Sequence, residues 1–508
     1  MSDTRLVAGA AEIDLQAIVE AYSARCPERP ITCQYRPQSG PSNSFKKWTF
    51  QTPGARPHAA ARRSVRPGDK ALASSITYLR SFGCETDKRD VEASVALSAT
   101  VRRTVERLLS ERYGADVRIA GVEAFPHYPQ VARCALEAAG RAAPATVIVR
   151  LARNPQDDPA RSGVAWLRNE QAALEFLRSI GSTLAPRCIA GDAATGVLVT
   201  EDLGMHPSLL DLLLGRDETA ARQGLLAFAC GLGTLHTQTA GRASAYQERR
   251  TRLGPPDLHA EDPMAPGRVT AHLQRVQDAV AQLGLPGPYG VEGDVQEVVR
   301  TLSAPGAYLA LSSGDPSPVN CQVVDGAVRF FDFEAAGFRH AFLDATVLRY
   351  LYPTGGPVWQ LPEEVAGKVE RAYREALVHG CPEAQDDATY ERGMAAASAA
   401  WTILRMERLP RVAAGPDRDT WPLVPPSWLG PLPTRSRRRQ LVAIMETCIG
   451  SVRRAGALAT FATWCERLVS ALRERWPEAT EAIPLYPAFA RHPTADGQAA
   501  TVTPAEER

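Results

Sequence analysis

Three side chains in the stretch 311–334 have the types and spacing that suit phosphoryl transfer. Asp315 comes first, Asn320 follows five residues later, and Asp332 follows twelve residues after that. Phosphoryl transfer uses a carboxylate beside the attacking hydroxyl, together with an Asn and a second Asp that hold Mg²⁺ on the nucleotide phosphates. The sequence therefore predicts that this stretch is a catalytic loop.

Two short apolar runs, CQVV and AVRFF, lie in the middle of the stretch and are joined by Asp325-Gly326. Asp-Gly between such runs predicts a β-hairpin, because both central residues can adopt a positive φ. Along the second run, Val328, Phe330 and Asp332 fall on one face of the strand. A carboxylate that continues an apolar face needs a partner, and a metal ion is a good one.

The stretch resembles the aminoglycoside phosphotransferase and choline kinase-like family of the protein-kinase-like superfamily. That family has the pattern H-G-D-x-x-x-x-N followed by D-[FWY]-E or D-x-D, and here Ser313 stands in the His position. The resemblance implies that Asp315 is the catalytic base, that Asn320 and Asp332 are Mg²⁺ ligands, and that ATP is the phosphate donor. The alternative is an ordinary Gly-Asp-Pro turn, followed by a strand that ends in Asp by chance.

Composition and charge limit the other functions that the chain could have. Its 508 residues are enough for two or three domains, and 44% hydrophobic with 23% charged residues is ordinary for a globular protein. A formal net charge of +1 predicts no general attraction to nucleic acid or to membranes. Ten cysteines without a Cys-x-x-Cys pair argue against a zinc site or a disulfide scaffold. No apolar run is long enough for a secretory signal or a membrane span, so we expect a cytoplasmic protein.

The two ends of the chain differ from its middle. Residues 1–92 are rich in Pro, Ser, Gly and Arg between Tyr35 and Lys70, and only residues 13–22 have the pattern of a helix. We expect a largely disordered extension, although a basic arm could also contact nucleic acid or an acidic partner. The tail 488–508 is predicted to be disordered as well.

Residues 93–204 have the order of elements expected for the small lobe of a kinase. A helical pattern over 100–113 precedes three strand-like runs, VRIAGVEAF, QVARCALEA and TVIVRLA, then a helix over 164–179 and a final strand. Residues 205–487 then predict a larger, mostly helical lobe that contains the catalytic loop. The predicted fold class is therefore α+β, a bilobal protein-kinase-like fold with a small antiparallel sheet and one main helix in its N-lobe.

One buried charge is predicted on the apolar face of the helix over 164–179. Glu170 falls within the apolar stripe of the helix over 164–179, where a carboxylate is costly unless it is paired. Arg150, at the end of TVIVR, is the natural partner, and Arg153 competes with it. Kinase-like folds place a phosphate-binding Lys in that strand and a Glu in that helix. The resemblance thus assigns Arg150 and Glu170 to the nucleotide site, since Arg can bind a carboxylate and still meet phosphate.

Other nucleotide contacts are assigned by position alone. Glu201 and Leu203, in GVLVTEDLG, resemble the family's hinge, whose backbone groups bind adenine; an ordinary exit from a strand is the alternative. The turn over 123–130 should cradle the phosphates but contains two Pro and lacks Gly, and His127 is its candidate contact. The resemblance further implies that His236 packs beneath the catalytic loop and that Asp344 braces it.

Two functional hypotheses follow. The first is an ATP- and Mg²⁺-dependent phosphotransferase that acts on a hydroxyl of a small molecule, with a nucleotide as its other partner and neither nucleic acid nor membrane involved. The second is a catalytically weak, nucleotide-binding pseudokinase that serves as a regulatory or scaffold module, which Arg150, Ser313 and the Gly-poor turn favour. The presence of the full metal set favours the first. The helical lobe has no dense acidic cluster of the kind that a polycationic aminoglycoside needs, and the sequence does not name the acceptor.

Overall fold

A computed structural model of the chain describes four short N-terminal strands and residues 97–125, 130–138, 143–152, 163–254, 264–350, 359–417 and 436–490. His127, Arg153 and residues 491–508 lie outside these ranges, as does most of the extension 1–92. None of the described helices has the length and apolar character needed to cross a membrane.

The chain divides into two compact units, Met1–Ser94 and Val95–Arg508. In the first unit, β1 (Arg5–Ala8) pairs with β2 (Ala11–Asp14), and β3 (Thr32–Tyr35) pairs with β4 (Trp48–Gln51), both antiparallel. The prediction of a helix from residue 13 is wrong at its start, because Ile13 and Asp14 belong to β2. The alternating run Ala-Glu-Ile-Asp suits a strand, and the rest of the predicted helix lies outside the described residues.

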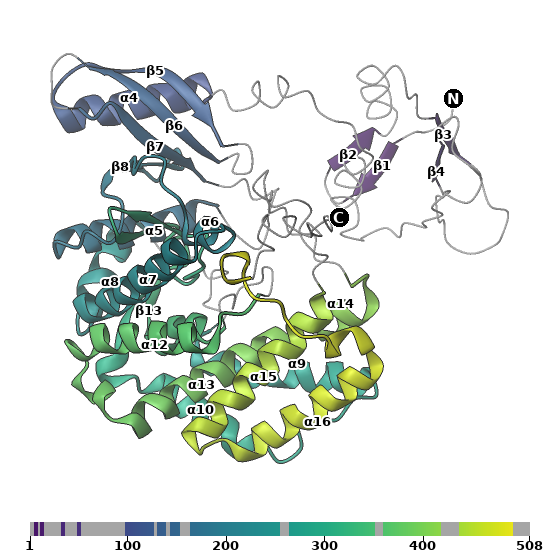
Figure 1. Cartoon of the computed structure of the whole chain (residues 1–508). Helices are drawn as coiled ribbons and strands as arrows, with labels where there is room; N and C mark the ends of the chain where they lie inside the picture. Colours follow the sequence, from purple (N-terminus) through teal and green to yellow (C-terminus); the bar gives the residue numbers. More distant parts are fainter. Residues whose placement is uncertain are drawn as a thin grey trace, which may run out of the picture. The chain divides into compact units, whose positions relative to one another are not determined.

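A five-stranded antiparallel sheet with the order β5-β6-β7-β9-β8 forms the smaller part of the second unit. Its strands are β5 (Val117–Ala124), β6 (Val131–Ala138), β7 (Thr146–Leu151), β8 (Cys188–Asp192) and β9 (Val197–Glu201). Helix α4 (Ala99–Tyr113) packs against this sheet and shares a hydrophobic core with it (Figure 1). The helix begins where the Ser98 side chain accepts a hydrogen bond from the Val101 N–H, and ends at Gly114 with a φ of 63°.

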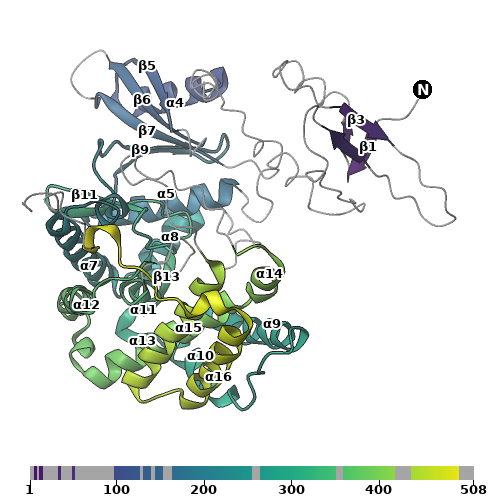
Figure 2. The ribbon, with the colours of Figure 1, turned by 45° about the vertical axis from the view of Figure 1, so that its right-hand side comes forward.

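Helix α5 (Gly163–Ser179) connects the sheet to a second, larger core. Its apolar side chains, among them Leu167, Leu174 and Leu177, are buried in the core that the helical part of the unit forms. Figures 1 and 2 both show the sheet at one end of the unit and the long helices at the other.

The larger part of the unit is mostly helical. Its helices are α6 (Leu209–Leu213), α7 (Glu218–Thr239), α8 (Ala243–Arg252), α9 (Val269–Gln282), α10 (Glu292–Ser303), α11 (Phe342–Ala345), α12 (Glu363–Val378), α13 (Asp387–Met406), α14 (Leu409–Ala414), α15 (Arg437–Ala455) and α16 (Ala459–Arg475). Two small antiparallel pairs lie among them: β10 (Leu309–Ser312) with β13 (Gly337–His340), and β11 (Cys321–Val324) with β12 (Ala327–Phe330). A small antiparallel sheet beside a larger helical part confirms the predicted fold class.

Candidate active site

The hairpin of β11 and β12 brings the two predicted metal ligands to one end. Its turn is the predicted Asp325-Gly326, with φ angles of 50° and 78°. Beyond the last strand pair, the Phe331 N–H donates to the Asn320 carbonyl at 3.0 Å. Asn320 and Asp332 therefore leave the hairpin side by side, at its open end.

Asp332 has a backbone conformation that few side chains adopt. Its φ is 65°, and a left-handed conformation costs a non-glycine residue about 1–3 kcal/mol, although Asp tolerates it better than most. The Asp332 side chain is 27% exposed, and its Oδ1 accepts a hydrogen bond from Arg150 Nη2 at 2.8 Å. Strain of this kind concentrates at functional sites.

Arg150, in β7, joins three carboxylates from two parts of the chain. Its Nη1 donates to Glu170 of α5 at 2.7 Å, its Nη2 donates to Asp332 at 2.8 Å, and Glu334 lies 3.6 Å from Nη2. The pairing of Arg150 with Glu170 was predicted from the sequence, whereas the bond to Asp332 was not. A small pocket beside this cluster is lined by Arg150, Glu170, Glu334 and Trp166, among other residues.

Negative charge predominates in this cluster. The Glu170 side chain is 3% exposed, and its Oε2 is a buried acceptor without a hydrogen-bond donor in the described part of the chain. Burial raises the pKa of Glu170 to about 7, although Arg150 opposes this shift. Burial lowers the pKa of Arg150, but the surrounding carboxylates raise it by more, so the guanidinium stays charged. One guanidinium among three carboxylates leaves an excess of negative charge that a bound cation would balance.

The loop that carries Asp315 is held close to the segment that follows Asp332. Asn320 Nδ2 donates to the Asp315 carbonyl at 3.0 Å, so the amide oxygen is the atom that Asn320 can offer to a cation. Gly314 has a φ of 86°, and a Cβ there would lie 2.4 Å from the Ala335 carbonyl oxygen. Only glycine permits this close approach.

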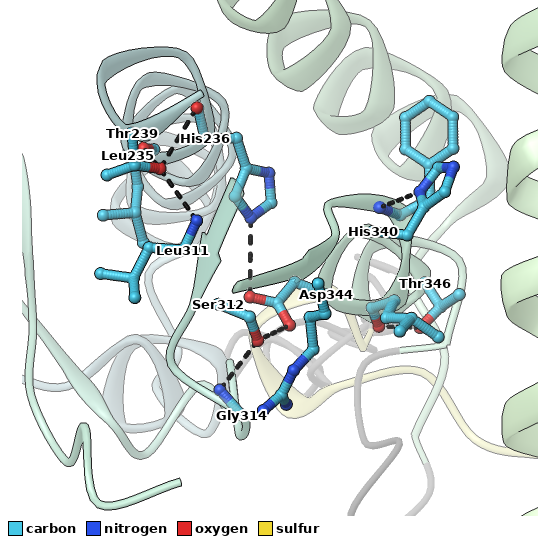
Figure 3. A network of polar contacts seen from close by, with 12 residues as sticks. Leu235, His236, Thr239, Leu311, Ser312, Gly314, His340, Asp344 and Thr346 are labelled. Atoms are coloured by element: carbon cyan, nitrogen blue, oxygen red, sulfur yellow. Dashed lines mark hydrogen bonds and ion pairs between the residues drawn. The ribbon is translucent and has the colours of Figure 1, made fainter. Parts of the chain in front are cut away.

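A buried polar network fixes the start of the same loop (Figure 3). The Ser312 hydroxyl donates to Asp344, and the Gly314 N–H donates to Ser312 Oγ at 2.9 Å. His236 Nε2 lies 3.5 Å from Asp344 Oδ2. The Nδ1 atom of His236 lies 3.0 Å from the Tyr373 hydroxyl. His236 and Asp344 thus contact each other beside the loop, as the resemblance implies. Ser312, which the sequence did not single out, connects them to it.

His340, in the same region, should make stability depend on pH. Burial, with His236 nearby, lowers the pKa of His340 to about 4. In the unfolded chain a His has a pKa near 6.5. Between the two pKa values, the unfolded state therefore binds a proton that the folded state does not bind. The free energy of unfolding should therefore fall as pH drops from about 6.5 towards 4, by about 2 kcal/mol between pH 7 and 5.

Thermal denaturation of His340→Phe at several pH values tests this expectation, because the variant should lose that part of the pH dependence. His379→Phe is the control, since His379 is exposed at the end of α12 and should keep it. An unchanged slope in His340→Phe would contradict the assignment.

Glu201 and Leu203 lie where β9 leads into the following linker. Glu201 Oε2 accepts hydrogen bonds from Arg329 Nη2 and from the Arg187 N–H, both at 3.1 Å. The Glu201 side chain is therefore occupied with structural contacts, and Leu203 is half-buried.

The predicted metal ligands suit Mg²⁺ in an incomplete protein site. Among the described residues, no group of three or more His, Cys, Asp or Glu side chains is placed to hold a metal ion. Mg²⁺ commonly takes one or two protein carboxylates and completes its shell with water and substrate phosphates. Asn320 and Asp332, beside an excess of negative charge, fit a site of that type.

No protein-family model matches the chain, and no curated protein matches it in sequence. Similar solved structures include a choline/ethanolamine kinase family protein from Mesorhizobium loti, at 16% identity over 70% of this chain and 93% of that chain, with a TM-score of 0.36. ADP-bound aminoglycoside phosphotransferase APH(2'')-Ib is similar at 11% identity, over 71% and 99% of the two chains, with a TM-score of 0.36. Amicoumacin kinase hAmiN with AMP-PNP is similar at 15% identity, over 64% and 88%, with a TM-score of 0.35. The similar structures thus include both kinds of kinase, choline kinase-like and aminoglycoside phosphotransferase-like, that the stretch 311–334 resembles.

Proposed function

We propose that the chain is an ATP- and Mg²⁺-dependent phosphotransferase that transfers the γ-phosphate to a hydroxyl of a small molecule in the cytoplasm. The observation that carries the proposal is the pair of hydrogen bonds from Arg150 to Glu170 and to Asp332. It supports the proposal because phosphoryl transfer needs the phosphate-binding groups and the metal-binding groups at one place.

Each residue has a role that its position supports. Asp315 orients the acceptor hydroxyl and takes its proton as the hydroxyl oxygen bonds to the γ-phosphorus and ADP leaves. Asn320 and Asp332 would hold Mg²⁺, which neutralises charge on the phosphates when bound. Arg150, positioned by Glu170, meets the phosphates. Most of the rate enhancement would then come from positioning and from charge neutralisation.

The lobes 93–204 and 205–487 would enclose the nucleotide, with the backbone around Glu201 and Leu203 at the adenine. The extension 1–92 and the tail 488–508 have no role in this proposal. A second candidate is a nucleotide-binding scaffold without turnover. The buried Ser313 favours it, because it stands where the resemblance expects a His.

Binding and turnover separate the two candidates. Thermal denaturation with and without Mg-ATP measures nucleotide binding, since a ligand that binds only the folded state must raise its stability. ATP consumption with a panel of hydroxylated metabolites then measures transfer. Binding with turnover supports the phosphotransferase, binding without turnover supports the scaffold, and the absence of both would refute the two proposals together.

Arg150→Lys should keep part of the activity. A Lys ammonium can still meet phosphate as a point charge, but it lacks the planar fork that bonds Glu170 and Asp332 at once. We expect kcat/KM to fall about tenfold, the equivalent of one lost interaction of about 1.4 kcal/mol. Arg150→Met is the matched control, because it removes the charge and should lose both activity and stabilisation by Mg-ATP. Equal losses in the two variants would show that charge at this position is not sufficient.

A further inference from the structure

A second arginine, Arg405, is buried near the end of α13 without the partners that such a group needs. It is 5% exposed, and its Nε is a buried donor with no hydrogen-bond acceptor in the part of the chain that the structure describes. Its guanidinium lies over the Trp401 ring, 5.0 Å from the centroid. Taking a guanidinium out of water without an acceptor costs several kcal/mol by general estimates. Among the described residues, the packing of α13 does not explain why a charged side chain is kept there.

The surroundings of Arg405 connect it to the catalytic loop. Burial, the largest influence, and then Arg408 lower the pKa of Arg405 to about 9, whereas Tyr350 and Asp315 oppose this shift. Asp315 is the one carboxylate among these influences. Arg405 therefore lies within electrostatic range of the proposed catalytic base.

Helix α13 is also fixed against that loop. Trp401 Nε1 donates to the Leu343 carbonyl at 2.8 Å, and the next residue, Asp344, accepts the hydrogen bond from Ser312 at the start of the loop. A short chain of buried contacts thus positions Arg405 relative to Asp315. A guanidinium that is placed by packing loses little entropy when it binds an anion.

Arg405 places a positive charge in this region, and its Nε has no hydrogen-bond acceptor among the described residues. An acceptor substrate that carries its own negative charge would supply one, whereas a cationic acceptor would be repelled.

We propose that the acceptor is a small hydroxyl compound with an anionic group, a carboxylate or a phosphate, and that Arg405 binds this group while Asp315 receives the hydroxyl proton. This inference rests on the proposed phosphotransferase activity. The guanidinium fork matches both groups, because each presents two oxygens in one plane. Arg405 is then kept for substrate recognition, although its burial lowers the stability of the folded protein.

Matched acceptors test the inference. Each set has one skeleton in neutral and anionic forms, such as glycerol, glycerate and glycerol 3-phosphate, or glucose, gluconate and glucose 6-phosphate. With saturating Mg-ATP, kcat/KM for an anionic member should exceed that of its neutral counterpart at least tenfold. The kcat/KM values for the carboxylate and the phosphate compounds show which of the two anions is used. Equal or higher kcat/KM for the neutral members, or for ethanolamine over serine, would overturn the inference.

Variants assign the preference to Arg405. Arg405→Gln should lower kcat/KM for the anionic acceptor at least tenfold more than for the neutral one, mainly through a higher KM. Arg411→Gln is the control, because Arg411 is exposed on α14 nearby. Equal loss for all acceptors would mean that Arg405 acts on the phosphoryl group or on folding instead.

Two further measurements keep the test decisive. Arg405→Met removes a desolvated charge and should raise the Tm of the ligand-free protein, whereas a structural role would make it fall.

If no compound is phosphorylated, the proposed function fails, and calorimetry with the anionic compounds then decides the anion site. Binding that Arg405→Gln abolishes supports that site, and binding that is absent or unaffected by the variant refutes it.

Discussion

Asp332→Asn should abolish the gain in thermal stability that Mg-ATP gives to the wild-type protein. A ligand at one hundred times its Kd stabilises the folded state by about 2.7 kcal/mol, so the wild type should gain several degrees in Tm. Asn cannot supply the negative charge that would hold Mg²⁺ and that balances Arg150. Turnover should fall together with binding, because the metal positions the phosphates that react.

The measurement compares each protein with itself, with and without Mg-ATP, because Asp332→Asn also changes the ligand-free pairing of Arg150. Asp325→Asn is a matched control: it makes the same chemical change in the same hairpin, at an exposed turn position with a φ of 50° that Asn accepts. Equal stabilisation of the wild type and Asp332→Asn would remove Asp332 from the metal site.

Asp315→Asn should have the opposite profile, with turnover lost and binding kept. A general base contributes about 10²–10⁴-fold to the rate, so kcat should fall by at least the lower figure. In the proposed reaction Asp315 receives the acceptor hydroxyl and need not touch the nucleotide, so the Mg-ATP shift in Tm should stay near that of the wild type. Steady-state kinetics beside the same thermal measurement give both quantities.

The comparison of these two carboxylates tests the enzyme hypothesis more sharply than either variant alone. In a scaffold that only binds nucleotide, Asp315→Asn would match the wild type in every assay. A loss of Mg-ATP binding in Asp315→Asn equal to that in Asp332→Asn would instead show that Asp315 belongs to the nucleotide site.

Long periodic segments made helices α4 and α5 predictable. The expected helix over 100–113 agrees closely with α4, and the helix over 164–179 agrees with α5. Strand β8 was missed because its sequence, CIAGD, is short and contains Ala and Gly, which have little strand preference. It lies at the edge of the sheet, where pairing with β9 stabilises a strand conformation that its own residues do not favour.

The site was predictable only where its signals were local. Asp315, Asn320 and Asp332 fall in one stretch, and a carboxylate within an apolar stripe predicted the pairing of Glu170 with Arg150. The bond from Arg150 to Asp332 joins residues 182 positions apart, which no sequence pattern indicates. Arg405 ends an Ala-rich helix, where a basic residue is ordinarily a favourable and solvated helix terminus, so only the packing reveals its burial.

In the hairpin of β11 and β12, the spacing of the two proposed metal ligands does not depend on the length of the exposed turn. The distance between Asn320 and Asp332 is set by strand register, whereas the tip at Asp325-Gly326 is exposed and distant along both strands. A residue added within β12 would turn Asp332 to the opposite face of the strand, while residues added at the tip leave the register intact. The tip is thus a place where a fluorescent reporter can be built into the chain, attached rigidly to the proposed metal ligands yet away from the reaction proposed for them.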